Sequence, residues 1–432
     1  MISERELLAK ISLRLIPFMF LLYIVSYLDR VNVSFASLQM NAALGFSAEV
    51  YSLGAGIFFI AYFLFEVPSN LILHRVGARL WIARIMITWG VISSAMMFVK
   101  GPTSFYVLRF LLGAAEAGFF PGMILYLTYW FPNEARGRAV GRFMTATAIA
   151  GAIGSPISGL LLQLNGVGGL GGWQWLFLIE GIPSILLAFV TLAYLPDGPG
   201  KASWLNADEK KWIAGRLEQE RAHGSSQQHD STRAAMSSRR VWTFAGIYFA
   251  IVMSFYGVTF WLPQIVKSFS GMNDFLVGCL AAIPWIAATV CMVIASKHSD
   301  ATRERRWHVA ISAVAGAAGL SGAGLTTNPV LELAALSLAA AGIWGTLGPF
   351  WAMSSETLAG TGAAAGIALI NSVGNLGGFG GPYLIGWVRT RTNNFTWGLV
   401  ALAVILLAGA VVTLVTKKEH KRHKEHRRNV VI

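Results

Sequence analysis

The sequence is built from apolar stretches, each about as long as a helix that crosses a lipid bilayer. Such a helix needs ~20 apolar residues, because the hydrocarbon core of the membrane is ~30 Å thick. Only 13% of the 432 residues are charged, against ~25% in soluble proteins. The sequence therefore predicts an all-α membrane protein and disfavours a soluble enzyme.

We predict twelve membrane-spanning helices in this chain. Their ranges are 13–36, 50–73, 80–100, 103–130, 139–164, 174–195, 241–267, 275–296, 307–326, 330–353, 362–388 and 395–416. A long polar segment follows the sixth helix. The predicted organisation is an N-terminal six-helix bundle (1–195), a cytoplasmic linker (196–240), a C-terminal six-helix bundle (241–416) and a basic tail (417–432).

Lysine and arginine are divided unevenly between the two sides of these helices. One side, which includes both termini and the linker, carries 28 of the 34 Lys and Arg residues, and the other side carries four. Cytoplasmic loops are the ones enriched in these residues. We therefore expect both termini in the cytoplasm and the helices in a bacterial inner membrane. Topology explains the net charge of +13, so no nucleic acid partner is expected.

Two polar regions have more specific patterns. In the linker, Asn206 and Glu209 have the spacing of a helix capping box, and Ile213 and Leu217 follow at helical spacing. This pattern predicts a short amphipathic helix on the membrane surface. The basic tail either anchors the chain on the cytoplasmic side or binds anionic lipid.

Landmarks in the two halves recur at one separation. His74, in the loop after the second helix, lies 226 positions before Asp300, in the loop after the eighth, and Pro156 lies 226 positions before Pro382. The shared offset predicts that the halves are structural repeats. Transporters built from such repeats bind their substrate between the halves, near the middle of the membrane.

Four ionisable residues lie inside the predicted spans of the first half: Asp29, Arg30, Arg109 and Glu116. Charges are costly at this depth and are therefore functional candidates. At a rise of ~1.5 Å per residue, Asp29 and Arg109 fall at similar depth and Glu116 near the midplane. The guanidinium fork matches a carboxylate, so Arg30 is expected to bind an anion while Asp29 and Glu116 carry protons. A purely structural salt-bridge cluster is the alternative.

The second half carries no charge at the matching positions, where Phe255 and Tyr256 correspond to Asp29 and Arg30. We therefore expect the second half to contribute shape and hydrogen bonds. Candidates for contacts with a hydroxylated ligand are Tyr62, Asn371, Asn375 and Trp351. Two further acids stay open: Glu66 as a gate or a proton site, and Glu180 as a structural or functional group.

The chain resembles the major facilitator superfamily over its whole length. The loop with Gly77 and Arg79 and its counterpart with Asp300 and Arg305 are similar to the superfamily's paired cytoplasmic motif, with His74 in place of an acid. The resemblance implies a cytoplasmic gate formed by Arg75, Gly77, Arg79, Asp300 and Arg305.

More narrowly, the chain resembles the anion:cation symporter family. The matching segments are Tyr27-Leu-Asp-Arg-Val-Asn32, Arg109-Phe-Leu-Leu-Gly-Ala-Ala-Glu116 and Trp130-Phe-Pro-Asn-Glu-Ala-Arg136. The resemblance implies that Arg30 contacts the substrate carboxylate, that Asp29 and Glu116 couple protons, and that Arg109 pairs with Asp29. It also implies that Tyr27, Tyr62, Trp351 and Asn371 contact substrate. Family members carry tartrate, sugar acids or phthalate, and the Asp-Arg-Val-Asn stretch is most similar to tartrate-type members.

The predicted function is therefore proton symport of a small organic anion, such as a hydroxy acid or sugar acid, by a monomer. The proton gradient drives it, and no cofactor or metal is expected. An anion exchanger or uniporter with the same pocket is the alternative. A membrane enzyme lacks a supporting motif such as His-Glu-x-x-His or Gly-x-Ser-x-Gly, and a receptor would bind without flux.

Overall fold

The computed structural model describes residues 4–132, 145–224, 237–358 and 363–416. The helices of the first half are α1 (Glu4–Leu44), α2 (Ala48–Val76), α3 (Ala78–Ala95), α4 (Pro102–Glu116), α5 (Phe119–Thr128), α7 (Ala146–Leu161) and α8 (Gly172–Tyr194). Those of the second half are α11 (Arg239–Ser270), α12 (Asp274–Thr302), α13 (Arg306–Leu325), α14 (Pro329–Gly345), α15 (Leu347–Thr357), α16 (Ala363–Asn375), α17 (Gly377–Thr392) and α18 (Thr396–Val415). Helix α9 (Ala207–Gly224) lies in the linker.

The predicted twelve-span, all-α membrane architecture is confirmed. Eleven helical stretches of the described chain are long and apolar enough to cross a bilayer. The twelfth is the pair α16 and α17, which is interrupted at Leu376, so that neither part alone reaches spanning length.

Three spans predicted as single helices, 103–130, 330–353 and 362–388, are each divided into two. In the first, α4 ends at Glu116 and α5 begins at Phe119. Gly118 between them has φ +85°, and a Cβ there would lie 2.3 Å from the Ser69 hydroxyl oxygen. Glycine suits both the left-handed conformation and the close approach. The prediction was wrong here because hydrophobicity is continuous across the break.

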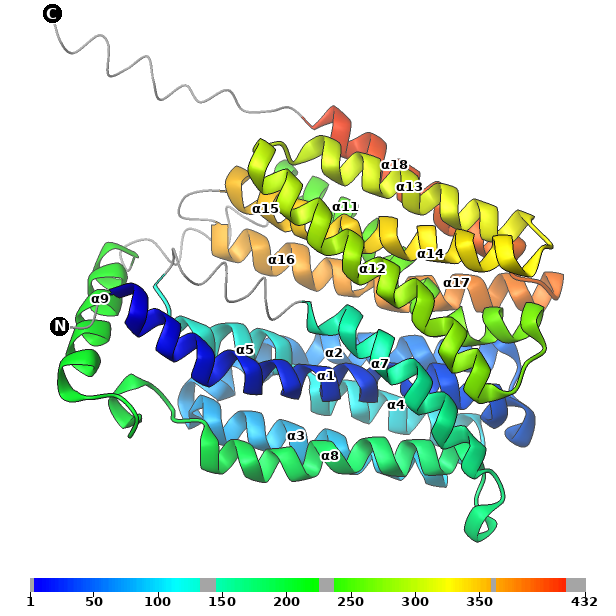
Figure 1. The fold of residues 1–432 in the computed structure, drawn as a ribbon, viewed down its shortest axis with the longest axis horizontal. Helices are drawn as coiled ribbons and strands as arrows, with labels where there is room; N and C mark the ends of the chain where they lie inside the picture. The colour runs from blue at the N-terminus through cyan, green and yellow to red at the C-terminus, as the bar shows by residue number, and fades with distance from the viewer. Residues whose placement is uncertain (1–3, 133–144, 225–236, 359–362, 417–432) are drawn as a thin grey trace, which may run out of the picture.

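The two halves lie side by side as two groups of roughly parallel helices, α1 to α8 and α11 to α18 (Figure 1). Close contact between the halves occurs where α7 packs on α12 and α2 packs on α17. A Cβ on Gly278 would lie 2.4 Å from the Ser155 carbonyl oxygen. Small residues thus let the backbones of α7 and α12 approach closely, as is common in membrane helix pairs.

Hydrogen bonds also join the halves near the end of the bundle opposite to α9. Gln264 Nε2 donates to Ser37 Oγ, and Gln39 Nε2 donates to Asp274 Oδ2, both at 2.7 Å. These residues lie near the end of α1, the end of α11 and the start of α12. The two halves are therefore held together at this end.

The linker helix α9 crosses the other end of the bundle, where α1 begins (Figure 1). Its predicted capping box is present, because Glu209 N donates to Asn206 Oδ1 and Asn206 N donates to Glu209 Oε2, both at 2.8 Å. Its apolar side chains Ile213 and Leu217 are buried in the protein core. The expectation that this face rests on the membrane surface was therefore wrong, because these side chains are buried within the protein.

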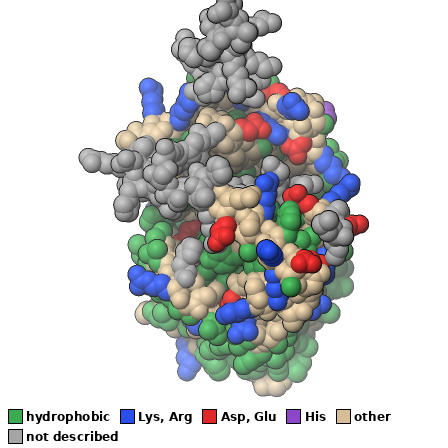
Figure 2. Space-filling model, turned by 90° about the vertical axis from the view of Figure 1, so that its left-hand side faces the viewer, with side chains coloured by type: hydrophobic (Ala, Val, Ile, Leu, Met, Phe, Trp, Pro, Cys, Tyr) green, Lys and Arg blue, Asp and Glu red, His purple; other side chains and the backbone are tan. Residues whose placement is uncertain are grey.

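Figure 2 looks onto the end of the bundle where α9 lies. Lys and Arg side chains are spread across this face, with Asp and Glu among them. The basic tail, 417–432, and the segment from Asn133 to Arg136 lie outside the described residues. The cytoplasmic orientation of this end stays a prediction.

We expect Glu209→Gln to lower the thermal stability of the protein at neutral pH. Lys10 Nζ lies 2.8 Å from Glu209 Oε1, and this contact, with the N–H of Asn206, holds the pKa of Glu209 below its usual range. A depressed carboxyl pKa stabilises the fold above the unfolded pKa and loses that effect as the pH falls. The difference in melting temperature from the wild type should therefore shrink on acidification through about pH 4.

Glu218→Gln is the matched control, because Glu218 is exposed on the same helix. A difference between the Glu209 variant and the wild type that does not change with pH would contradict the ionic role of Glu209.

Candidate substrate site

Arg30 and Glu116 form a buried ion pair at the boundary between the halves. Arg30 is 7% exposed and Glu116 is 1% exposed. Arg30 Nε donates to Glu116 Oε1 at 3.1 Å, Arg30 Nη2 makes a shorter contact with the same oxygen, and Ser26 Oγ donates to it at 2.8 Å. Glu116 is the last residue of α4, so the helix break that follows it fixes where this carboxylate lies.

The third contact of Arg30 crosses to the second half. Arg30 Nη1 donates to the Tyr256 hydroxyl on α11 at 3.1 Å. The two residues are 226 positions apart, which is the offset that relates the two repeats. Equivalent residues of two repeats can contact each other only close to the axis that relates them. Arg30 therefore lies close to the axis between the two halves, and transporters of this architecture bind their substrate at the interface of the repeats.

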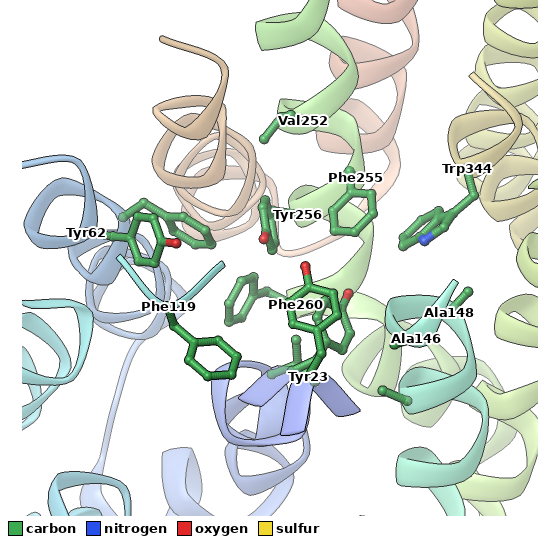
Figure 3. Close-up of a cluster of buried hydrophobic side chains, with 14 of the residues drawn as sticks. Tyr23, Tyr62, Phe119, Ala146, Ala148, Val252, Phe255, Tyr256, Phe260 and Trp344 are labelled. Atoms are coloured by element: carbon green, nitrogen blue, oxygen red, sulfur yellow. The ribbon is translucent and has the colours of Figure 1, made fainter. Parts of the chain in front are cut away.

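Aromatic side chains surround this pair. The Arg30 guanidinium lies 5.3 Å from the ring centre of Tyr62 and 5.5 Å from that of Phe58, within the range of cation–π attraction. Figure 3 shows Tyr23, Tyr62 and Tyr256, from α1, α2 and α11, with their hydroxyls directed toward one central region. The site thus combines one cation with several hydroxyl groups on apolar rings.

Asp29 does not pair with Arg109, contrary to the prediction. Its carboxylate accepts hydrogen bonds from Trp89 Nε1 at 2.9 Å, from Ser93 Oγ at 2.8 Å and, at shorter range, from Ser184 Oγ. All three donors are neutral and belong to α3 and α8. Asp29 is 1% exposed, so this carboxyl is buried inside the first half.

Arg109 instead donates to the backbone of α2. Its Nε reaches the Gly54 carbonyl at 3.1 Å and its Nη2 reaches the Ala55 carbonyl at 3.2 Å. Its side chain is fully buried, and it lies 5.0 Å from the ring centre of Phe58. The pairing that the family resemblance implied was therefore wrong, and the similar depth of the two residues does not place their side chains on facing sides of their helices.

The other predicted substrate contacts lie around this centre. Asn371 Nδ2 donates to Glu66 Oε1 at 3.2 Å, and Asn375 lies close enough to interact with the same carboxyl. The Trp351 ring packs edge-on against Tyr248, with centroids 4.8 Å apart. The two asparagines therefore lie beside Glu66, and Trp351 lies beside Tyr248.

Tyr27 is fully buried, and its hydroxyl has no hydrogen-bond partner among the described residues. Its ring packs edge-on against Trp285 of the second half, with centroids 6.0 Å apart. Glu180 accepts a hydrogen bond from Ser158 Oγ at 2.7 Å. Tyr27 therefore lies where the halves meet, and Glu180 lies between α7 and α8.

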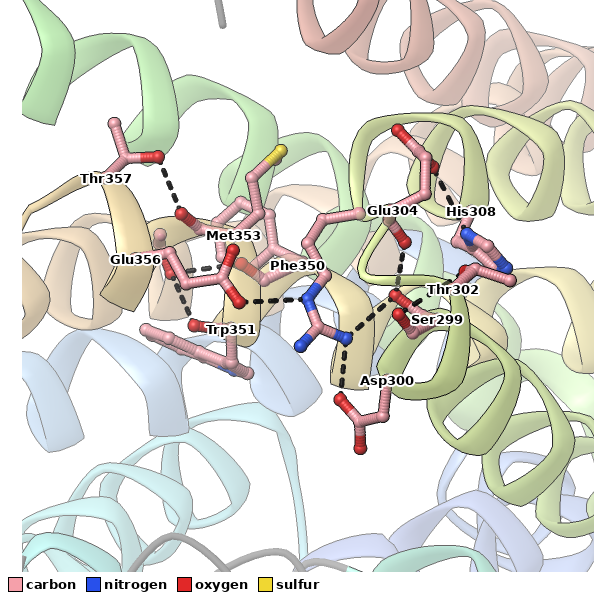
Figure 4. Close-up of polar contacts among 12 residues, drawn as sticks. Ser299, Asp300, Thr302, Glu304, His308, Phe350, Trp351, Met353, Glu356 and Thr357 are labelled. Atoms are coloured by element: carbon pink, nitrogen blue, oxygen red, sulfur yellow. Dashed lines mark hydrogen bonds and ion pairs between the residues drawn. The ribbon is translucent and has the colours of Figure 1, made fainter. Parts of the chain in front are cut away.

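The predicted gate residues differ between the two repeats. Arg305 forms ion pairs with Asp300 at 2.6 Å and with Glu356 of α15 at 3.1 Å (Figure 4). Burial works against its charge, but the two carboxylates keep the pKa of Arg305 above its usual value. In the first repeat, Arg79 Nη1 donates to the Leu192 carbonyl at 3.3 Å.

Arg75 and Gly77 are the other two predicted gate residues of the first repeat. Arg75 is exposed. Gly77 joins α2 to α3 with φ +99°, so glycine suits this turn.

Two residues of these clusters are absent from the predicted site. Tyr256 is one of them, although its offset of 226 from Arg30 is itself a signal for contact at the repeat axis. Glu356, which binds Arg305, gave no signal because it lies 51 positions away on another helix.

The profile of the Major Facilitator Superfamily matches residues 19–382. The chain belongs to this superfamily. It is 49% identical over 424 residues to a protein of Agrobacterium vitis named "Putative tartrate transporter", which covers 98% of this chain and 94% of that protein. It is 42% identical over 427 residues, or 99% of this chain and 98% of the relative, to the "Quinolone resistance transporter" of Acinetobacter baumannii.

The fold is similar to that of a solved major facilitator protein. The crystal structure of a bacterial homologue of the human lysosomal transporter Spinster, in an inward-facing and unoccupied conformation, superposes with a TM-score of 0.79. That match covers 96% of this chain and 97% of the other at 15% identity, and at this identity it shows the fold alone. The superfamily match and the relatives named as transporters, and not this structural match, show that the chain is a transporter and not an enzyme.

We expect Asp29→Ala to destabilise the protein much more than Asp29→Asn. Alanine leaves three buried donors without an acceptor, at a cost of ~1–3 kcal/mol each. Asparagine can accept from Trp89 and donate to Ser93, because a hydroxyl also accepts. Thermal unfolding of the purified variants in detergent measures the difference. Equal loss of stability in both variants would show that Asp29 must be ionised.

Proposed function

We propose that this chain is a proton-coupled symporter of a small organic anion, namely a hydroxy acid, a sugar acid or a related carboxylate such as tartrate. The observation that carries the proposal is the buried Arg30–Glu116 pair at the repeat axis, with Tyr256 of the second half on the same guanidinium. The relative named for tartrate supports a carboxylate substrate.

Proton coupling follows from how an anion would enter this site. A substrate carboxylate that binds Arg30 takes the place that Glu116 holds. Glu116 would then be a buried carboxylate without its cation, and breaking such a pair costs ~3–5 kcal/mol. Taking up a proton removes this cost, because a neutral carboxylic acid needs no counter-ion. Anion binding and proton binding are thus coupled at one side chain.

The remaining site residues have supporting roles in this proposal. Asp29 is a second proton-carrying acid, placed one residue before Arg30, and Arg109 fixes α4 against α2. Tyr62 and Tyr27 offer hydroxyls to the substrate. Residues of the second half, among them Trp351, Asn371 and Asn375, contact its far end.

We place the protein in the bacterial inner membrane with the α9 end in the cytoplasm. The hydrogen bonds at the opposite end then close the site to the outside. The Arg305 cluster lies on the cytoplasmic side and belongs to the gate there. Lipid is a further partner, and the tail is its candidate contact. We propose that the monomer is the working unit.

Two alternatives use the same pocket. An exchanger or uniporter would move the anion without net proton flux. A second candidate, favoured by the 42% identity to the quinolone resistance transporter and by the aromatic rings around Arg30, is transport of an aromatic carboxylate drug.

Transport by the purified protein in liposomes separates these possibilities. Labelled uptake and internal pH are recorded together for tartrate, galactonate, gluconate, glucarate, phthalate and a quinolone. Uptake of an anion with internal acidification supports symport. Uptake without acidification supports exchange or uniport, and uptake of the quinolone alone contradicts the hydroxy-acid class.

We expect Arg30→Ala to abolish anion binding and Arg30→Lys to weaken it strongly, because an ammonium lacks the two-pronged fork of a guanidinium. Glu116→Gln should retain exchange of internal for external anion, since glutamine resembles the protonated acid. The Glu116→Gln variant should lose the accumulation of anion that a proton gradient drives. Full accumulation by the Glu116→Gln variant would remove Glu116 from proton coupling.

A further inference from the structure

Glu66 connects the two halves of the protein close to the substrate site. It lies on α2, four residues after Tyr62 and therefore on the same face of the helix. Its Oε1 accepts the amide hydrogen of Asn371, on α16 of the second half, at 3.2 Å. Helix α2 runs toward the α9 end, so Glu66 lies about 6 Å closer to that end than Tyr62.

Apart from the amides of Asn371 and Asn375, little compensates the charge of the Glu66 carboxyl. It is 6% exposed, and its Oε2 has no hydrogen-bond partner among the described residues. Among the described residues, the charged and titratable groups that interact with it are Arg30 of α1, Tyr62 of α2 and Tyr248 of α11. Of these only Arg30 is a cation, and its hydrogen bonds go to Glu116 and Tyr256.

Glu66 thus accepts the hydrogen bond of Asn371 in the same way that Glu116 accepts those of Arg30. In each case a carboxylate of the first half binds a donor that the proposed substrate needs. Glu116 holds the guanidinium, and Glu66 holds the Asn371 amide. The two carboxylates mark two places where polar groups of a bound anion fit.

A substrate that fills both places needs two polar ends. One end is a carboxylate on Arg30. The other is a hydroxyl or second carboxylate that accepts from Asn371. An ionised Glu66 beside that second place repels an anion, and in low dielectric such repulsion is strong. A neutral Glu66 removes the repulsion and can donate its own O–H.

We propose that Glu66 is a second exchanging carboxyl of this transporter, protonated while the far end of the anion lies at Asn371 and ionised when the anion leaves. The inference rests on the proposed function. On release toward the α9 end, the Glu66 proton passes to the same compartment as the anion. The ionised carboxylate then takes the Asn371 amide and keeps the released anion from returning.

Binding of tartrate to the purified full-length protein, measured across the neutral pH range, tests this role. If the anion binds together with one proton, its apparent affinity falls about tenfold for each unit of pH on the alkaline side, and each further proton adds the same factor. We expect Glu66→Gln to reduce this dependence by one proton. At alkaline pH the variant should bind tartrate about tenfold or more tighter than the wild type, and at acidic pH equally well.

Glu332→Gln is the matched control. Glu332 is a half-buried acid at the start of α14, remote from the site, and its loss should leave the pH dependence unchanged. An unchanged pH dependence in Glu66→Gln, with tartrate binding intact, contradicts the proposal. So does loss of binding at every pH in a variant that melts like the wild type. Absence of pH-dependent binding of any panel anion by the wild type would instead contradict the proposed function.

Asn371→Ala tests the position of the second polar place. It should weaken binding of tartrate more than binding of lactate, a hydroxy acid without a second carboxylate. In combination with Glu66→Gln its effect should be non-additive, because both residues act through one hydrogen bond. Equal weakening for tartrate and lactate would show that the far end of the anion lies elsewhere.

Discussion

The buried pair of Arg30 and Glu116 is the interaction on which the arrangement of the site depends. A charge inside the membrane is tolerated only with a partner or with water. The break after α4 sets the end of that helix at Glu116, and the third donor of Arg30 reaches across to Tyr256. The close crossings of α7 on α12 and of α2 on α17 bring the halves near enough for this contact. One ion pair thus links a helix break, the domain interface and the site.

The balance of buried charge in the first half supports the proposal that protons take part in transport. Among the described residues of the first half, four carboxylic acids are buried, Asp29, Glu66, Glu116 and Glu180, against two guanidiniums, Arg30 and Arg109. The hydrogen bonds of Asp29, Glu66 and Glu180 come from neutral donors. An anion that binds near these acids adds negative charge in a region of low dielectric constant, where repulsion between like charges is strong. In the proposed mechanism, protons that bind to these acids compensate this charge.

Much of this fold could be predicted from the sequence, because span length and repeat offset are set along the chain. The spans follow from bilayer thickness, and the offset of 226 predicted paired halves that the structure joins at Arg30 and Tyr256. The direction of a side chain around its helix is set by packing. The pairing of Asp29 with Arg109, which the family resemblance implied, is therefore absent, and the partners of Asp29 are Trp89, Ser93 and Ser184.

The contact of Arg30 with its own repeat counterpart also explains why the two halves differ in charge. Two residues at equivalent positions that contact each other at the repeat axis cannot both be arginine, because two like charges ~4 Å apart repel by about 4 kcal/mol even at an effective dielectric constant of 20. Tyrosine is neutral and accepts the guanidinium hydrogen. A central anion site on a repeat axis therefore favours asymmetry, with the cation and its exchanging acids in one half and hydrogen-bonding groups in the other.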